Sequence, residues 1–382
     1  MSSLENAVQP KTRDLSLDVL KGLGCLLMIM AHMPFKLGWY KDLTFLGGFA
    51  PVPFYAVVGV TAFFQAQKYL PRPVILNYLV LFFLGFALNG FNSPDFLRPP
   101  VIHFDIIQVI AMGALAVYLF ERCFKPPVWL YLIVGVLCFL LKPALDVLLP
   151  VQDHPLLAGI LLPYSGTFPV IPWLFLFFLG AYVYRIGPRW NFSWAAVSTL
   201  IFVALAMSGV NLEYRSKFDM SLGYFLLSCI LAFALFLVFL NFKVLNRPSP
   251  FNPILFFGQN SLLFLFVHFA AIAFFSLQLQ WEVKVPLIKH HPFLMWLLIF
   301  AVTWITMLIL LYLAKINPRR ACFDRIWVWV LLVALVWTVP LLPNNELVRW
   351  TAVGLGTVAS LHYHQLSRAL KGAPAQLPGV PS

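Results

Sequence analysis

The chain is 382 residues long, 61% of its residues are hydrophobic, only 10% are charged, and its mean hydropathy is +0.87. Because about a quarter of the residues of a soluble domain are charged, this composition excludes a soluble protein and predicts an all-α, polytopic membrane bundle. The net charge of +12 is large enough for a nucleic-acid partner. The distribution of Lys and Arg described below instead explains this charge as the cytoplasmic excess that is usual in membrane proteins.

Apolar runs long enough to cross a bilayer recur along almost the whole chain. Eleven are clear and a twelfth, at 346–364, is weaker, so the sequence predicts a bundle of 11 or 12 transmembrane helices. We expect a cytoplasmic segment at 1–14, one transmembrane domain at 15–364, and a disordered, Gly- and Pro-rich tail at 365–382. The clear runs lie at 16–35, 45–66, 74–91, 103–121, 127–149, 168–186, 194–211, 221–242, 255–277, 293–314 and 326–342.

The positions of Lys and Arg indicate how this bundle is oriented. If the predicted spans alternate from a cytoplasmic N-terminus, 16 Lys and Arg lie on the cytoplasmic side and 8 lie outside. A cytoplasmic excess of Lys and Arg is the rule in membrane proteins, so we expect an integral protein of a cytoplasmic membrane, in particular a bacterial inner membrane. Membrane lipid is then a predicted partner and nucleic acid is not. No pair of the five Cys has metal-ligand spacing, so no metal site is predicted.

The first predicted span carries three ionisable residues, Asp18, Lys21 and His32. Such residues are costly at membrane depth and normally face the protein interior or a water-filled cavity. Lys21 and His32 are 11 positions apart, which places them about 20° apart around a helix and roughly 16 Å apart along it. Asp18 precedes Lys21 by one turn, on nearly the same stripe. One helix face therefore carries a cation near its inner end and an imidazole near its outer end, which suits a conduit.

Polar and aromatic residues also open two later spans from the outer side. His103 and Asp105 begin the fourth span, and Gln108 lies one turn after Asp105. The sixth span begins with the segment FPVIPW at 168–173, which ends in Trp173. We predict that His103, Gln108 and Trp173 contact a substrate and that Asp105 belongs to the catalytic site.

The ninth predicted span combines an amide, a hydroxyl and an imidazole. Asn260 and Ser261 lie near its inner third, and His268 lies deeper, past the membrane midplane. Because polar groups at this depth should face one shared cavity, we expect His268 to meet His32 and Asp105. Hydrogen bonds from Asn260 or Ser261 to His268 are the structural alternative.

These residues favour acyl transfer. A hydroxyl or amine acceptor must lose a proton as it attacks a thioester, and neutral imidazole has a suitable pKa to take that proton. A carboxylate such as Asp105 would orient the imidazole and stabilise its protonated form, and a cation such as Lys21 would hold the phosphates of coenzyme A. Two other functions stay open, a transporter or flippase of a sugar or lipid intermediate and a non-catalytic membrane scaffold.

Four segments resemble the heparan-alpha-glucosaminide N-acetyltransferase-like family and, more distantly, the acyltransferase-3 family. The spacing between Lys21 and His32 is similar to a Lys-or-Arg to His pattern of the second family, and Lys21 stands where the first family usually has Arg. Because all four segments come in the same order as in the family, the resemblance is specific. They are SLDVLKG at 16–22, FDIIQVIA at 104–111, PVIPWL at 169–174, and FGQNS at 257–261 followed by His268.

The resemblance implies a membrane acyltransferase that takes an acyl group, acetyl in the first instance, from cytoplasmic acyl-CoA. It implies a glycan or lipid-linked sugar on the far side as the acceptor, acetyl-CoA as the donor substrate, and no metal. The lysosomal member carries its proposed catalytic His in the loop after the first span, but 33–46 contains no His here, so the role of base passes to His32. The predicted catalytic residues are His32, Asp105 and His268, and the predicted donor contacts are Lys21, Asp18, Asn260 and Ser261.

Overall fold

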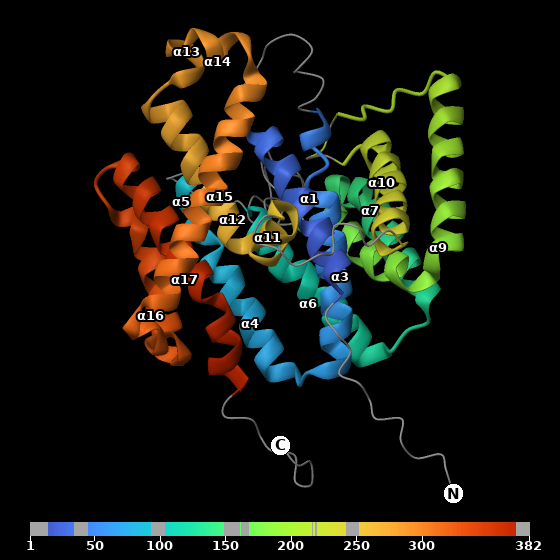
Figure 1. Ribbon diagram of the computed structural model, residues 1–382. Coiled ribbons are helices and arrows are strands. Elements are labelled where there is room, and N and C mark those ends of the chain that lie inside the picture. Colours follow the sequence, from blue (N-terminus) through green and yellow to red (C-terminus); the bar gives the residue numbers. More distant parts are fainter. Residues whose placement is uncertain are drawn as a thin grey trace, which may run out of the picture.

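The computed structural model describes residues 14–33, 45–92, 104–148, 168–215, 220–241 and 252–371, together with residues 161 and 217. Over these residues the protein is helical and has no strand, and its helices pack into one bundle (Figure 1). Eight helices are long and apolar enough to cross a membrane, and the number rises to ten if each of two bent helix pairs is counted as one span. The prediction of an all-α, polytopic membrane bundle is confirmed.

The first helix, α1 (Leu15–His32), begins at a side-chain cap. The carboxylate of Asp14 accepts a hydrogen bond from the backbone N–H of Ser16 at 3.0 Å, which satisfies one of the donors that a helix start leaves without a partner. The next two long helices each begin with Pro, whose fixed φ suits a first turn. The helices that follow are α3 (Pro51–Lys68), α4 (Pro71–Leu84), α5 (Phe86–Asn92) and α6 (Ile106–Phe124).

Three further helices form one side of the bundle (Figure 1). They are α7 (Val128–Leu148), α9 (Val170–Met207) and α10 (Leu222–Asn241). The sequence predicted two spans here, at 168–186 and 194–211. The 38 residues of α9 cover most of both, and a break at Gly187 separates its two parts. Gly187 has a φ of 77°, a value that side chains with a Cβ rarely adopt.

The second half of the chain begins with a broken helix. Its arms, α11 (Pro253–Gln259) and α12 (Ser261–Ala273), are bent by 107° at Asn260. A break of this kind exposes backbone polar groups at membrane depth, which is tolerated where they line a cavity. The remaining elements are η2 (Phe274–Gln278), α13 (Trp281–Lys284), α14 (Pro286–His290), α15 (Pro292–Ile316), η3 (Pro318–Asp324), α16 (Ile326–Thr338), η4 (Val339–Leu341) and α17 (Asn345–Lys371).

Two glycines let α1 and α11 pack backbone to backbone. A Cβ on Gly258 would lie 1.7 Å from the carbonyl oxygen of Asp18, and a Cβ on Gly22 would lie 1.8 Å from the carbonyl oxygen of Ile254. Any other residue at either position would force the two helices apart. The close contact holds the N-terminal half of α1 against the broken helix.

The last helix, α17, corrects two expectations from the sequence. It is not among the helices apolar enough to cross a membrane, although the sequence offered 346–364 as a weak span. It also continues to Lys371, so residues 365–371 belong to the helix and not to the predicted disordered tail. Gln365 and Leu366 are buried, at 3% and 0% exposure, which explains why the helix does not end at 364.

Candidate active site

Two imidazole rings from distant parts of the chain lie face to face. His32 ends α1 and His268 lies in α12, and their ring centroids are 5.7 Å apart with an angle of 18° between the planes. Phe269 contacts both rings with a centroid distance of 4.4 Å to each, and Phe264 stacks on His268 at 4.7 Å. The predicted meeting of His32 and His268 at one place is therefore present in the structure.

The ring nitrogens of this pair have few partners. Nδ1 of His268 lies 2.9 Å from the carbonyl oxygen of Phe264, and since a carbonyl can only accept, Nδ1 carries the hydrogen when this ring is neutral. Nε2 of His268 and Nδ1 of His32 are both buried and have no hydrogen-bond partner in the described part of the chain. Buried polar atoms are usually paired, so two ring nitrogens without a partner among the described residues mark this pair as a candidate functional site.

Asp105 lies at the start of α6, where its carboxylate caps the helix. Its oxygens accept hydrogen bonds from the backbone N–H of Ile106 at 2.6 Å and from the Asn92 side chain at 2.7 Å. No hydrogen bond between Asp105 and His32 or His268 occurs among the residues described. The predicted function of Asp105 as the residue that orients an imidazole is therefore not supported by a direct contact.

Gln108 completes this cap. Its amide oxygen accepts a hydrogen bond from the backbone N–H of Asp105 at 3.1 Å, and its amide nitrogen donates to Asn89 at 2.7 Å. The residue is fully buried, so in this structure Gln108 fixes Asp105 and the end of α5. A contact between Gln108 and substrate stays a prediction, and His103 lies outside the described residues.

Trp173 is also fully buried, in an aromatic cluster next to Asp105. Its ring packs edge to face against Tyr55 at 5.5 Å and against Tyr224 at 5.8 Å. The Trp173 Nε1–H and the Tyr55 hydroxyl both lack a hydrogen-bond partner among the described residues. Trp173 therefore packs α9 against α3 and α10, and its contact with a substrate stays a prediction.

Lys217, in the connection between α9 and α10, lies close enough to interact electrostatically with both Asp105 and His32. Burial lowers the pKa of Lys217, and the negative charge of Asp105 opposes that change. Burial also raises the pKa of Asp105, while hydrogen bonds from Ile106 and Asn92 and the charge of Lys217 oppose the rise. Sequence reasoning missed Lys217, because a single Lys in an outer loop carries no pattern of its own.

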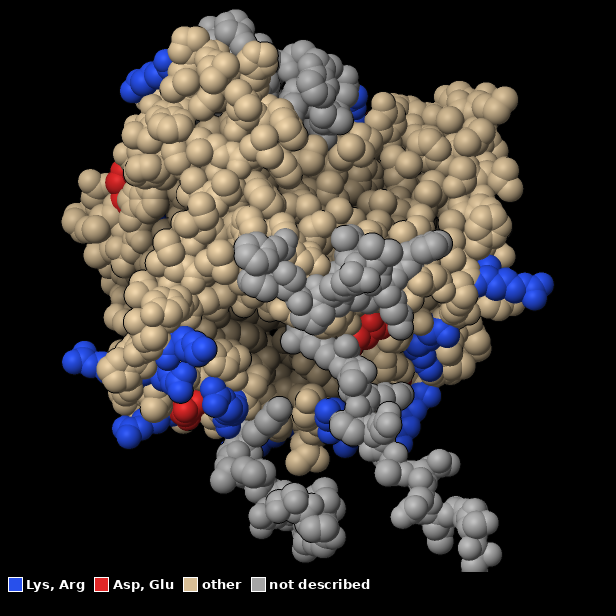
Figure 2. Space-filling view, in the orientation of Figure 1, with Lys and Arg blue, Asp and Glu red and all other residues tan. Residues whose placement is uncertain are grey.

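A cavity of about 800 Å³ opens at the other end of the bundle, between the α11–α12 bend and the C-terminal helices. Its walls are strongly basic, and Figure 2 shows a hollow flanked by Lys and Arg side chains in the lower part of the molecule. Three of the predicted donor contacts, Lys21, Asn260 and Ser261, line it. Its other polar lining residues are Gln259, Lys315, Arg320, Asp324, Ser360, His362, Tyr363, His364, Gln365 and Arg368.

The fourth predicted donor contact, Asp18, lies behind Lys21. Lys21 Nζ and Asp18 Oδ1 are 3.2 Å apart, and the side chains are 20% and 4% exposed respectively. Because Asp18 is buried and Lys21 reaches the cavity, Asp18 positions the ammonium group and does not itself face the cavity.

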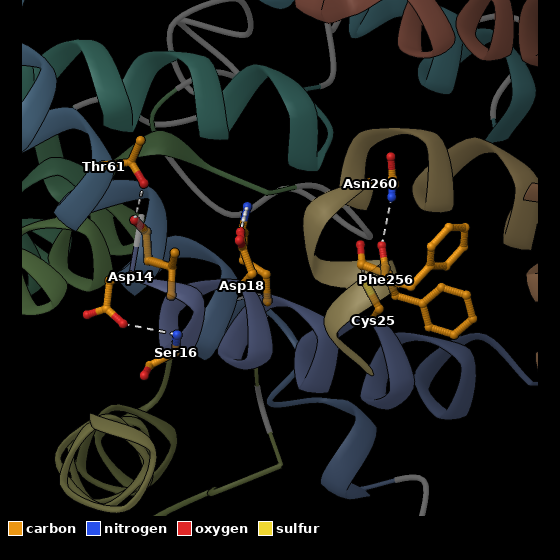
Figure 3. Close-up of polar contacts among 10 residues, drawn as sticks. Asp14, Ser16, Asp18, Cys25, Thr61, Phe256 and Asn260 are labelled. Atoms are coloured by element: carbon orange, nitrogen blue, oxygen red, sulfur yellow. Dashed lines mark hydrogen bonds and ion pairs between the residues drawn. The ribbon is translucent and has the colours of Figure 1, made fainter. Parts of the chain in front are cut away.

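The bend at Asn260 adds backbone donors to this cavity. The side chain of Asn260 donates back to the carbonyl oxygen of Phe256 at 2.9 Å and makes no cap bond to α12 (Figure 3). The first N–H groups of a helix lack intrahelical partners, and together with the helix dipole they favour an anion. With Ser261 at the start of α12 in the cavity wall, the helix start and the surrounding cations form a site suited to phosphate groups.

The C-terminal part of the wall contains residues that the sequence analysis did not single out. His362 stacks on Phe323 with ring centroids 3.8 Å apart, and Arg368 Nε lies 3.8 Å from Asp324 Oδ1. Burial lowers the pKa of His362 and of His364. Their position in the cavity depends on α17 folding back over the bend, a contact between distant segments that sequence spacing does not reveal.

A second, narrower cavity of about 200 Å³ runs between α1, α3, α4, α6 and α12. On α3 it is lined by one helical stripe, from Gln65 near the inner end through Thr61 and Val58 to Phe54, which spans roughly 16 Å. We call this cavity the passage. Its remaining lining residues are Lys21, Met28, Asn77, Tyr78, Leu81, Ile106, Ile110, Ser261, Leu262, Leu265 and Tyr363.

The passage adjoins the basic cavity and extends toward the imidazole pair. Lys21 and Ser261 line both the passage and the basic cavity. At the other end, the passage is lined by Met28, one turn before His32, and by Ile106, which directly follows Asp105. Basic cavity, passage and imidazole pair therefore follow one another along α1, in the order that the Lys21 and His32 spacing predicted.

Comparison with protein-family models matches residues 13–212 to heparan-alpha-glucosaminide N-acetyltransferase, catalytic. No curated protein matches the chain. The family match covers more than half of the sequence and contains Lys21, His32 and Asp105, whereas the α11–α12 bend and His268 follow it. The chain therefore belongs to the heparan-alpha-glucosaminide N-acetyltransferase family and is a multi-pass membrane acetyltransferase.

Proposed function

We propose that this protein transfers an acetyl group from cytoplasmic acetyl-CoA to a glycan or lipid-linked sugar on the far side of the membrane. The observation that carries the proposal is the order of the basic cavity, the passage and the imidazole pair along α1, in which the passage adjoins the cavity at Lys21 and extends to Met28, one turn before His32. The family supplies the acetyl group, because its name specifies N-acetyl transfer to a glucosaminide.

The distribution of charge supports a cytoplasmic position for the basic cavity. In Figure 2, Lys and Arg side chains gather at the lower end of the molecule, where α17 ends in Figure 1. Cytoplasmic ends of membrane proteins are enriched in Lys and Arg. Acetyl-CoA, which is made inside the cell, would then enter from the side where the cavity opens.

The basic cavity suits the nucleotide of coenzyme A, which carries a diphosphate and a ribose phosphate. Lys21, Lys315, Arg320 and Arg368 line it, and the N-terminus of α12 faces it. Phosphate groups form charge-assisted hydrogen bonds with Lys and Arg and bind at helix N-termini. We assign the predicted donor contacts Asn260 and Ser261 to this helix start, and Asp18 to holding Lys21.

The passage suits the pantetheine arm and the thioester. Its inner part offers polar groups, among them Gln65, Thr61 and Asn77. Its outer part is formed by apolar side chains such as Met28, Phe54 and Ile106. This gradient matches an arm with two amide groups that ends in an apolar thioester, and the apolar end would keep water from the acetyl group.

His32 is the proposed base. As the acceptor oxygen or nitrogen attacks the carbonyl carbon of the thioester, its proton passes to an imidazole nitrogen of His32. The carbon–sulfur bond then breaks, and the departing thiolate of coenzyme A takes the proton from the imidazolium. The products are the acetylated acceptor and the free thiol, and His32 is neutral again. His268, stacked on His32, would orient the ring and share the proton.

The purified protein in detergent provides a direct test. Acetyl-CoA binding is measured by calorimetry, and release of the coenzyme A thiol is followed with D-glucosamine as the probe acceptor. We expect wild-type protein to bind acetyl-CoA and to release thiol, and His32→Ala to bind it without release. A folded wild-type protein that does not bind acetyl-CoA would contradict the proposal and favour a transporter.

A further inference from the structure

We propose that Lys217 stabilises the negative charge that develops on the acetyl carbonyl oxygen during transfer, and that Asp105 holds its ammonium group in place. This inference rests on the proposed acetyl transfer. Lys217 lies beyond residues 13–212, the part of the chain that the family model matches, so the family match gives it no function.

The backbone around Lys217 is fastened to the bundle. Leu212 and Met220 flank Lys217 and are buried, at 6% and 1% exposure. The N–H of Gly223 donates to the carbonyl oxygen of Leu212 at 2.9 Å, and the N–H of Met220 donates to the carbonyl oxygen of Lys217 at 3.1 Å. The described residues on either side of Lys217 are therefore anchored to the bundle.

The side chain of Lys217 lies along the outer end of the helices that form the passage. A Cβ on Gly48 would be 3.9 Å from Cδ of Lys217, so the aliphatic stem passes over this glycine. The carbonyl oxygen of Gly48 accepts a hydrogen bond from the Tyr224 hydroxyl at 2.9 Å, which ties the segment before α3 to α10. The aliphatic stem of Lys217 therefore rests on a supported backbone segment. This support limits the movement of the ammonium group at its end.

The glycine before Gly48 packs on the end of α1, since a Cβ on Gly47 would lie 2.5 Å from the backbone nitrogen of Ala31, the residue before His32. Lys217 therefore lies at the end of α1 that carries His32. It attracts the carboxylate of Asp105 and acts electrostatically on His32, the proposed base. The Asp105 carboxylate is itself fixed by Ile106 and Asn92. A charge pair in a partly buried setting requires such additional hydrogen bonds to be stable. Asp105 therefore acts as the counterion of Lys217, which gives this predicted catalytic residue a positioning function.

The chemistry needs a cation at this place. When the acceptor attacks, an electron pair of the carbonyl double bond moves to the oxygen, which becomes negatively charged. A cation that is already fixed near that oxygen stabilises it without reorganisation. An ammonium group has three hydrogens, so Lys217 would donate to the carboxylate and to the carbonyl oxygen together. No atom of Lys217 is transferred.

Substitution of Lys217 by Met, with Arg215 as the matched control, tests this inference. Arg215 lies two residues earlier and its guanidinium contacts the rings of Phe45 and Tyr214. With acetyl-CoA as donor and D-glucosamine as probe acceptor, we expect Lys217→Met to lower kcat about 100-fold or more with little change in the donor KM. Arg215→Ala should keep a wild-type kcat, and Lys217→Arg should recover part of the loss.

A chemical rescue separates the ammonium charge from a structural function. Lys217→Cys, in a background with the exposed Cys123 and Cys322 replaced by Ser, is alkylated with 2-bromoethylamine to restore an ammonium at nearly the same length. We expect kcat to recover after alkylation, with acetyl-CoA binding unchanged throughout. Loss confined to the acceptor KM, or Lys217→Met with wild-type kcat, would overturn the inference while leaving acetyl transfer intact. A wild-type protein without thiol release would overturn both.

Discussion

Lys21 and Tyr363, from opposite ends of the chain, line the same two cavities, so the basic cavity and the passage meet between α1 and α17. The Tyr363 hydroxyl accepts a hydrogen bond from Asn77 at 2.9 Å, which fixes α17 against α4 at this junction. The donor substrate would pass here from its nucleotide site into the passage. This junction explains why one Lys on α1 serves a site that is built mostly from the C-terminal helices.

Lys21→Ala should weaken acetyl-CoA binding by about tenfold or more, because a hydrogen bond to a charged group contributes roughly 1.5–3 kcal/mol. Lys21→Arg keeps the charge and should keep most of the binding. Lys68→Ala, which removes a Lys outside both cavities, serves as the control. Calorimetry on purified protein gives the dissociation constants. An unchanged constant in Lys21→Ala would show that Lys21 serves only its ion pair with Asp18.

Blocking the passage should weaken binding of the pantetheine arm of acetyl-CoA without affecting binding of its nucleotide. Thr61→Phe places a ring in the passage, so acetyl transfer should fall sharply and acetyl-CoA should bind less tightly. Adenosine 3′,5′-diphosphate, which has no pantetheine arm, should bind as it does to wild type because it needs only the basic cavity. Thr61→Val keeps the size of the side chain and should stay active. Equal losses for both ligands would argue against a passage.

The contact between α1 and α11 should be sensitive to a single methyl group. Gly258→Ala puts a Cβ into the backbone of Asp18, and we expect a loss of roughly 1–3 kcal/mol in stability and a lower melting temperature in detergent. Gly354→Ala is the control, because a Cβ there meets nothing within 4 Å and Ala favours a helix by up to about 1 kcal/mol. Similar melting temperatures for the two variants would contradict the backbone contact.

The packing of α17 should weaken in mild acid. Burial lowers the pKa of His362 and His364, whereas an unfolded imidazole titrates near pH 6.5. The unfolded state therefore binds protons more readily, so stability is highest above about pH 6.5 and falls as the pH decreases below it. His362→Phe keeps an aromatic ring against Phe323 and removes one titrating group. Its melting temperature should decline less than that of wild type between pH 7.5 and 5; parallel declines would count against this explanation.

Much of the fold could be predicted from the sequence, because apolar runs of span length leave few alternatives in a membrane protein. The spacing of Lys21 and His32 also indicated that the candidate site extends along α1, from a cation near one end to an imidazole near the other. The sequence analysis assigned Asp105 to catalysis and Gln108 to substrate binding. The same pair could also be interpreted as a helix cap, because Asp followed three residues later by Gln is a capping-box pattern. The structure forms that capping box.

Other parts of the site depend on contacts that no local pattern specifies. His362 and His364 lie in a helix of low hydropathy that resembles a weak span, and only its packing over the α11–α12 bend brings them to the basic cavity. Lys217 lies in a loop in the second half of the chain and acts electrostatically on Asp105. Such convergence is set by tertiary packing, which is why sequence spacing did not identify these residues.

The central claim is that the protein, with His32 as the base, transfers acetyl from a donor on one side of the membrane to an acceptor on the other. Proteoliposomes test it most directly, with labelled acetyl-CoA enclosed on the side of the basic cavity and D-glucosamine added outside. We expect labelled N-acetylglucosamine outside with wild-type protein and with His291→Ala, and at least about 100-fold less with His32→Ala, although this variant still binds acetyl-CoA. Wild-type rates in His32→Ala, or product only on the donor side, would contradict the account.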